Sequence, residues 1–341
     1  MPGQEYVDHP SGPEVLIVDT MGGASGPEVV ALLEKAGCRV TVSHEHREDE
    51  VIASARDADG IVFTGPISRR LIDSLTRCRV IARSSIGMDN VDGIDLATEK
   101  GIVLCNMPGV IEEEVADHTF ALLLAAARRI TLQDRALRAG AWERRDDMGT
   151  GGTPRVFGAT LGIVGVGRIG QAVARRARGF EMRLLGVDPV VDDATFAALG
   201  VRRATLAEVL QESDFVTLHV PLEGGTRHLI GAPELRLMKR SAILVNTSRG
   251  PVVDEIALVD ALKSGQVAGA GLDVMEEEPI GADHPLSGLD NVVLTPHSAS
   301  RSGWTDRMRH LRPAEEVAAV LNGHRPRAVW NPEVLARLDL R

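Results

Sequence analysis

Runs of β-branched and aliphatic residues alternate along the chain with segments whose apolar positions recur at helical spacing. Between residues 14 and 106 the apolar runs are VLIVD, RVTVS, GIVFTG, RVIARSS and IVLCN, with helical patterns at PEVVALLEKAG and near residues 68–76. Apolar strands that alternate with helices indicate a parallel sheet covered on both faces. The first hundred residues are therefore predicted to form an α/β unit.

The alternation restarts at TLGIVGV, residues 160–166, and continues to NVVLT, residues 291–295, which predicts a second doubly wound sheet. Between the units, residues 110–130 (VIEEEVADHTFALLLAAARRI) are predicted to form one long helix. This helix is apolar on too many faces for a surface helix, so we expect burial in a domain or subunit interface. Residues 140–155 are predicted as an extended arm, and RPAEEVAAVLNG, residues 312–323, as a last helix.

Composition narrows the class of protein. The 341 residues, 44% hydrophobic and 25% charged, suit about two globular domains, and a net charge of -10 disfavours nucleic acid or an anionic membrane as a partner. No apolar run approaches the roughly 18 to 20 residues of a membrane span, and the first residues lack a signal-peptide pattern, so we expect a cytoplasmic protein. Cys38, Cys78 and Cys105 are odd in number and widely spaced, which favours reduced thiols over a disulfide or metal site.

A dinucleotide motif follows the strand TLGIVGV. Gly165, Gly167 and Gly170 have the G-x-G-x-x-G spacing, which permits a tight turn, close approach to a pyrophosphate and close helix packing. The next strand ends in Asp188, whose carboxylate is expected to bind the ribose hydroxyls and repel a 2'-phosphate, so the motif predicts NAD rather than NADP. Arg168 is either a pyrophosphate partner or a solvated surface arginine.

Three polar stretches follow the last three strands of the second sheet: VNTSRGPVVDE, DVMEEEPI and TPHSAS. Carboxyl ends of parallel strands meet at one edge, so an Arg, a Glu and a His are expected to converge. Hydride transfer between a hydroxy acid and NAD needs a cation for the acid and a base for the hydroxyl proton, and a carboxylate can orient a histidine for that task. The three residue types fit this chemistry.

At this point the chain resembles the D-isomer-specific 2-hydroxyacid dehydrogenases, which include phosphoglycerate dehydrogenase and the C-terminal binding proteins. The resemblance extends from RSSIGMDNVD and GIVLCNMPG through VADHTFALLLAAARRI, TLGIVGVGRIG, NTSRGPVVDE and GAGLDVMEEEP to LTPHSAS. It implies a flavodoxin-like substrate domain of residues 1–108 and 299–341, and a Rossmann NAD-binding domain of residues 109–298. It also implies NAD-dependent interconversion of a small 2-oxo acid and its D-2-hydroxy acid, and a homodimer formed through residues 111–130 and the following arm.

The resemblance assigns roles to single residues. Arg249 becomes the substrate clamp, His297 the acid and base, and Glu278 its carboxylate partner, which leaves Glu276 and Glu277 as a solvated turn. Asp273 is similar to a residue that binds the nicotinamide carboxamide, with a structural strand-end role as the alternative. The other residues expected at the cofactor are Ile169, His219, Val220, Pro221, Thr226 and Thr247, with mainly the backbone of His219 involved.

A loop in the first unit is similar to the family loop whose amides hold the substrate carboxylate. The expected substrate-binding residues here are Ser84, Ser85, Ile86 and Gly87, together with Arg249 and His297. Ser85 replaces a family glycine and is expected to narrow the pocket or to add a hydroxyl.

Two alternatives remain open. Phosphoglycerate-specific members have basic residues after the third strand, where this chain has FTGPIS, residues 63–68, and Arg69 and Arg70 further on are expected to face solvent. WERR, residues 142–145, does resemble the arm of those enzymes, so phosphoglycerate is the second choice of substrate. The other alternative is an NADH-sensing, protein-binding module that resembles the C-terminal binding proteins.

Overall fold

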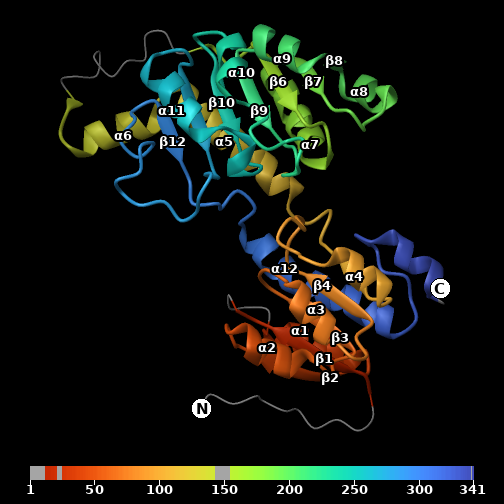
Figure 1. Ribbon diagram of the computed structural model, residues 1–341. Coiled ribbons are helices and arrows are strands. Elements are labelled where there is room, and N and C mark those ends of the chain that lie inside the picture. Colours follow the sequence, from red (N-terminus) through yellow and green to blue (C-terminus); the bar gives the residue numbers. More distant parts are fainter. Residues whose placement is uncertain (1–11, 21–24, 143–153, 339) are drawn as a thin grey trace. The chain divides into compact units, whose positions relative to one another are not determined.

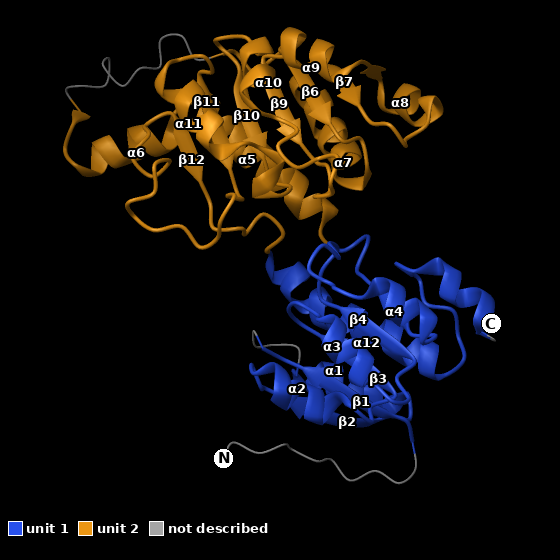
Figure 2. Cartoon of the chain, viewed as in Figure 1, with its two compact units in different colours: residues 1–110, 302–341 blue, residues 111–301 orange. Residues whose placement is uncertain are grey.

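The chain forms two compact α/β units in the computed structural model (Figures 1 and 2). The structure describes residues 12–20, 25–142, 154–338 and 340–341. Unit 1 comprises Met1–Val110 and Ser302–Arg341, and unit 2 comprises Ile111–Arg301. Most of the expected arm, including three of the four residues of WERR, lies outside the described residues.

Unit 1 is built on a five-stranded parallel sheet of order β2-β1-β3-β4-β5, the flavodoxin-like order. Its strands are β1 Glu14–Val18, β2 Arg39–Ser43, β3 Gly60–Phe63, β4 Val80–Arg83 and β5 Val103–Cys105. Helices α1 (Pro27–Lys35) and α12 (Gly303–Leu321) bury their apolar side chains on one face. Helices α2 (Glu48–Ala55), α3 (Arg69–Ser74) and α4 (Ile94–Glu99) cover the other face. Helices therefore cover both faces of this sheet.

Unit 2 is built on a seven-stranded parallel sheet of order β12-β11-β10-β9-β6-β7-β8. Its strands are β6 Thr160–Val164, β7 Arg183–Val187, β8 Val201–Arg203, β9 Phe215–Leu218, β10 Ile243–Asn246, β11 Gly269–Leu272 and β12 Val292–Leu294. Helices α5 (Glu112–Ala127), α7 (Arg168–Ala177) and α8 (Asp193–Leu199) pack on one face. Helices α9 (Leu206–Glu212), α10 (Ala232–Leu237) and α11 (Glu255–Lys263) pack on the other. Both units confirm the predicted doubly wound class.

Two helices differ from their predicted bounds. The segment expected as one helix over residues 110–130 breaks at Arg129, which has a left-handed φ of 50°, and a second helix, α6 (Ile130–Arg138), begins there. The last helix begins at Gly303 rather than at residue 312, because Ser302 caps it by accepting from the Thr305 amide at 3.1 Å. Pro313 therefore lies inside the helix, ten residues after its first residue.

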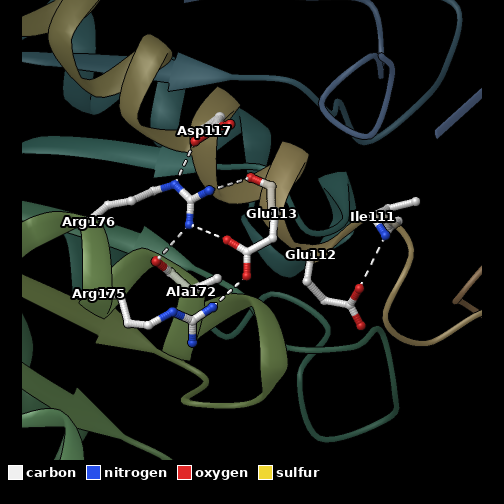
Figure 3. Close-up of polar contacts among 7 residues, drawn as sticks. All are labelled: Ile111, Glu112, Glu113, Asp117, Ala172, Arg175 and Arg176. Carbon is white, nitrogen blue, oxygen red and sulfur yellow. Dashed lines mark hydrogen bonds and ion pairs between the residues drawn. The ribbon is translucent and has the colours of Figure 1, made fainter. Parts of the chain in front are cut away.

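The long helix α5 is attached to the helix that follows the glycine motif. Arg176 of α7 lies 2.7 Å from Glu113 and 2.6 Å from Asp117 of α5, and Arg175 lies 2.5 Å from Glu113 (Figure 3). The hydrogen bond from Arg176 is the main cause that holds the pKa of Glu113 below its usual value, against a smaller opposing effect of burial. These ion pairs attach the last turn of α7 to the N-terminal part of α5.

In the described part of the chain, no helix combines the length and the apolar character that crossing a bilayer would require.

Candidate active site

The predicted residues of unit 2 follow the carboxyl ends of adjacent parallel strands. In sheet order from β12 to β7, the residues after the strands include His297, Glu278, Arg249, His219, Gly165 and Asp188. The chain order reverses between β9 and β6, and ligands of open α/β sheets bind at such a switch point. The fold therefore places all six residues along one edge of one sheet.

His297 and Glu278 form a hydrogen-bonded pair. The Nδ1 atom of His297 lies 2.8 Å from Oε2 of Glu278, and the other carboxylate oxygen accepts the Met275 amide at 3.1 Å. An ionised carboxylate only accepts hydrogen bonds, so Nδ1 carries a proton and Nε2 is the ring atom that can exchange one. The His297 side chain is 50% exposed, which leaves it accessible to a ligand. The predicted pairing of these two residues is present.

Arg249 is held by the turn that follows β10. The buried Asn246 donates to the Arg249 carbonyl at 2.9 Å and accepts from the amide and hydroxyl of Ser248. At the next residue, Gly250, a Cβ atom would lie 1.7 Å from the Met275 carbonyl oxygen, so only glycine fits. The loop of Arg249 is thus packed directly against the loop that leads to Glu278.

Asp273 is fully buried, and both of its carboxylate oxygens accept hydrogen bonds. Oδ1 accepts from the Thr295 hydroxyl at 2.6 Å and the Ser298 amide at 2.9 Å, and Oδ2 accepts from the Ala299 amide at 2.8 Å. Burial alone would raise the pKa of Asp273, but hydrogen bonds from His118, Thr295 and these amides outweigh it and lower the pKa. These contacts favour the structural alternative over a contact with the nicotinamide.

The glycine motif has the space that a dinucleotide needs. Gly165 has a φ of 91°, and a Cβ there would lie 2.7 Å from the His219 carbonyl oxygen, while a Cβ at Gly170 would lie 2.1 Å from the Gly165 oxygen. At Gly167 a Cβ would meet no atom of the described residues within 4 Å. Two glycines therefore serve backbone packing, and the third opens onto space beside the first turn of α7, as a pyrophosphate requires.

Asp188 contacts this motif. Its Oδ2 accepts the Val166 amide at 2.9 Å, and Oδ1 accepts the amides of Val190 and Val191 at 2.8 and 3.0 Å. The carboxylate therefore shapes the glycine loop and lies where the ribose is expected. Arg168, the first residue of α7, is exposed, so both predicted alternatives for its side chain stay open.

The segment after β9 approaches the glycine motif through its backbone. The His219 amide donates to the Val164 carbonyl at 2.7 Å, and its ring Nε2 lies 2.9 Å from the Thr217 hydroxyl. Burial lowers the pKa of His219 to about 3, so its ring is neutral. Thr226 closes the same loop by donating to the Pro221 carbonyl at 2.6 Å. Both side chains are thus engaged in holding the loop that includes the expected cofactor residue Val220.

Thr247 and Ile169 are the last of the expected cofactor residues. The Thr247 hydroxyl lies 3.0 Å from that of Thr119 on α5, and both threonines are buried. Ile169 is partly buried against the apolar core of unit 2. Both residues therefore have structural contacts of their own, and their contact with a cofactor stays a prediction.

One sequence interpretation of the acidic turn is wrong. Glu276 was expected to be solvated, but its Oε1 lies 2.7 Å from Nε2 of His228 and 3.2 Å from Arg227, and its side chain is only 23% exposed. Its partners are almost fifty residues away, so the run of three glutamates gave no signal for them. Glu277 is exposed, as expected.

The expected substrate loop of unit 1 is held by Arg83. This buried arginine donates to the carbonyl oxygens of Gly65 at 2.7 Å and Gly87 at 2.9 Å. The Ser85 hydroxyl donates to the same Gly87 oxygen at 2.8 Å, so it supports the loop instead of adding a free hydroxyl. Sequence reasoning missed the role of Arg83, whose only signal was a cation at the end of an apolar strand.

The backbone amides of this loop fall into two groups. The Ser84 amide donates to the Phe63 carbonyl at 3.2 Å and continues the sheet, which speaks against its expected contact with the substrate. The amides of Ser85, Ile86 and Gly87 donate to no other group in the described parts of the chain. These three are the donors in this loop to which a carboxylate can bind.

Asn246, Thr295 and His118 were also absent from the sequence predictions. His118 on α5 lies 2.9 Å from the Thr295 hydroxyl and 3.5 Å from Asp273, so a residue of the long helix supports the loop of His297. Residue type gave no signal for it, because the contact spans more than 150 residues of sequence.

Residues 120–299 match the family described as "D-isomer specific 2-hydroxyacid dehydrogenase, NAD binding domain". The chain belongs to this family. It is an NAD-dependent oxidoreductase that interconverts 2-oxo acids and 2-hydroxy acids.

Similar proteins match this chain over most of its length and support its place in the family. A glyoxylate reductase of Korarchaeum cryptofilum is 48% identical over 84% of this chain and 86% of that protein. A D-3-phosphoglycerate dehydrogenase of Methanocaldococcus jannaschii is 38% identical over 89% of this chain, which spans 57% of that longer protein. The crystal structure of a glyoxylate reductase from Paecilomyes thermophila has a TM-score of 0.81 at 30% identity and covers 94% of this chain and 99% of that one.

Proposed function

We propose that this enzyme reduces a small 2-oxo acid of the glyoxylate type with NADH. The observation that carries the proposal is the His297–Glu278 pair, 2.8 Å apart, at the strand ends of a sheet with an open glycine motif. Relatives named glyoxylate reductases, up to 48% identical to this chain, support the size of the substrate.

NADH held at the glycine motif and Asp188 would supply a hydride to the carbonyl carbon of the acid. The Nε2 atom of His297 donates a proton to the carbonyl oxygen, so that the C=O group becomes CH–OH. His297 enters the reaction as a cation and leaves it neutral, with the proton on Nδ1 still facing Glu278. The Glu278 carboxylate accepts the hydrogen bond from Nδ1 and so fixes the orientation of the ring. Oxidation of the hydroxy acid is the reverse.

The carboxylate of the acid needs positive charge and hydrogen-bond donors. We propose that Arg249 provides the positive charge, because its guanidinium can bind a carboxylate in a fork geometry. We propose that the amides of Ser85, Ile86 and Gly87 provide the hydrogen-bond donors. Fixing the acid in this way holds its carbonyl carbon in place for hydride transfer, which accounts for much of the rate enhancement of such enzymes.

The surface ion pairs of α3 speak against a phosphorylated substrate. Arg69 lies 2.8 Å from Asp95, and Arg70 lies 2.7 Å from Asp49, with exposed side chains in both pairs. Both guanidinium groups thus face solvent in ion pairs with acidic residues, as the sequence predicted. A phosphate group on the substrate would have no additional cation from this segment.

The proposal includes a homodimer in the cytoplasm. Helix α6 has no buried residue, and Ile130, Leu137 and Trp142 in or next to it are 52%, 42% and 63% exposed. A second copy of this chain would cover these apolar side chains, and symmetric dimers are the commonest oligomers. The three cysteines are free and buried, which suits a reducing compartment.

The test is the loss of NADH absorbance with a panel of 2-oxo acids. The panel contains glyoxylate, hydroxypyruvate, pyruvate, a branched oxo acid, an aromatic oxo acid and 3-phosphohydroxypyruvate. We expect the highest kcat/KM with glyoxylate or hydroxypyruvate and a much lower value with the phosphorylated acid. If 3-phosphohydroxypyruvate gives the highest kcat/KM, the proposal is wrong and the enzyme is a phosphoglycerate dehydrogenase.

A further inference from the structure

Glu255 and Glu276 hold each other's backbone. The Glu276 amide donates to Oε2 of Glu255 at 3.1 Å, and the Glu255 amide lies 3.5 Å from Oε2 of Glu276. The two residues are 21 positions apart, on the first turn of α11 and on the loop after β11. We call this reciprocal pair the glutamate clamp.

Cationic or protonated groups surround the glutamate clamp. Glu276 contacts His228 and Arg227 through Oε1, and Oε1 of Glu255 lies 3.0 Å from Nε2 of His284. Because a carboxylate only accepts hydrogen bonds, the facing Nε2 atom of each histidine carries a proton. The side chains of Glu255 and Glu276 are only 19% and 23% exposed. Two half-buried carboxylates with this many donors form a fixed network rather than a solvated turn.

The glutamate clamp joins the two segments that carry the proposed catalytic groups. Glu255 lies six residues after Arg249, beyond the short 3-10 helix Gly250–Val252. Glu276 lies two residues before Glu278, whose carboxylate accepts the amide of Met275. The close approach of Gly250 to the Met275 carbonyl lies between these positions. The segments thus meet at two points, one backbone contact and one pair of carboxylates.

We propose that Glu276, together with Glu255, is a positioning residue for Glu278 and therefore for the ring of His297. The inference rests on the proposed function, because it assigns the clamp a role only through Glu278. Without the clamp, the loop from Met275 to Glu278 keeps its covalent connections but loses its attachment to α11 and to the segment after β9. A displacement of about 1 Å at a reacting group can lower the rate of turnover roughly 100-fold.

The test uses Glu276→Gln with Glu277→Gln as the matched control. Glutamine replaces one acceptor oxygen by an NH2 group, so it cannot accept from both His228 and the Glu255 amide. Glu277 is the exposed neighbour, and the same change there removes the same charge. We expect Glu276→Gln to lower kcat roughly 10- to 100-fold while NADH affinity and binding stoichiometry, measured by fluorescence titration, stay unchanged. Glu277→Gln should retain the wild-type kcat.

A double mutant distinguishes positioning from a general structural effect. If Glu276 acts through Glu278, Glu276→Gln has almost no effect on kcat when Glu278→Gln is already present. If it only stabilises the fold, the two losses multiply, and the proposal is overturned. An unchanged kcat in Glu276→Gln overturns it too. If Glu276→Gln fails to fold by circular dichroism, the same cycle with His284→Gln decides between these outcomes.

Different results would contradict the proposed function and the positioning role of Glu276. Full turnover in Glu278→Gln would contradict the role of Glu278 itself, whereas a large loss there with no loss in Glu276→Gln contradicts only the positioning role.

Discussion

The backbone amide of His297 donates a hydrogen bond to the carbonyl oxygen of Asp273 at 2.8 Å. The carboxylate of the same aspartate accepts from the two amides that follow, those of Ser298 and Ala299. His297 has a left-handed φ of 49°, and these three bonds hold the turn in that conformation. Asp273 thus shapes the turn that presents the proposed acid and base.

Asp273→Ala is expected to lower the free energy of unfolding by about 3 kcal/mol, because it leaves buried donors without their charged acceptor. Urea denaturation measures the change. Asp290→Ala is the control, since Asp290 is an exposed partner of Arg135, and its loss should cost less than about 1 kcal/mol. Equal losses in the two variants would contradict the structural role of Asp273.

His297→Asn is the preferred variant for testing the acid and base. Asparagine tolerates a positive φ better than alanine, so the turn is kept while the imidazole is lost. We expect kcat to fall about 100- to 10,000-fold, the usual contribution of general acid and base catalysis, with NADH binding largely intact. Stopped-flow turnover and fluorescence titration measure the two quantities. Parallel loss of both would contradict the assigned role.

His219 is expected to make the fold sensitive to acid. Its folded pKa of about 3 lies below an unfolded value of about 6.5, so the unfolded chain binds the proton first, and stability falls as the pH drops below about 6.5. Between pH 7 and pH 5 this linkage amounts to at most about 2 kcal/mol. His219→Gln keeps a nitrogen near the Thr217 hydroxyl but removes the titration. Urea unfolding at the two pH values should show a smaller loss in this variant, and an equal loss would refute the linkage.

The features found correctly from the sequence are local or periodic. The glycine motif could be found because its spacing is that of a single turn, and Asp188 because it directly follows the next strand. The His297–Glu278 pair required the family resemblance, because periodicity shows that strand ends converge but not which of three glutamates faces the histidine.

The features missed depend on contacts between distant segments. Glu276 binds residues from the loop after β9, and Asp273 binds the turn after β12, so neither role is visible in the neighbouring sequence. The break at Arg129 was missed because an arginine gives no signal for a left-handed conformation. The last helix was predicted to begin at residue 312, whereas its cap, Ser302, lies ten residues earlier.

Asp188→Asn is expected to weaken the preference for NADH over NADPH by about tenfold or more, which corresponds to about 1.4 kcal/mol. The amide oxygen can still accept from the Val190 and Val191 amides, but the charge that repels a 2'-phosphate is gone. The ratio of kcat/KM for the two cofactors measures the effect. Asp193→Asn, an exposed change of the same charge nearby, should leave this ratio unaltered. An unchanged ratio in Asp188→Asn would remove the residue from cofactor selection.

Gly167→Ala and Gly170→Ala alter the same motif, but we expect the first to weaken NADH binding and the second to lower the stability of the fold. A Cβ at residue 170 would lie 2.1 Å from the Gly165 oxygen, so Gly170→Ala should lower the melting temperature by several degrees. At residue 167 the methyl group meets no atom within 4 Å in the part of the chain that the structure describes, so Gly167→Ala should melt like the wild type. It should nevertheless bind NADH at least about tenfold more weakly, because the methyl group enters the space expected for the pyrophosphate. Calorimetry and fluorescence titration measure the two effects, and wild-type NADH affinity in Gly167→Ala would show that the cofactor does not approach this glycine.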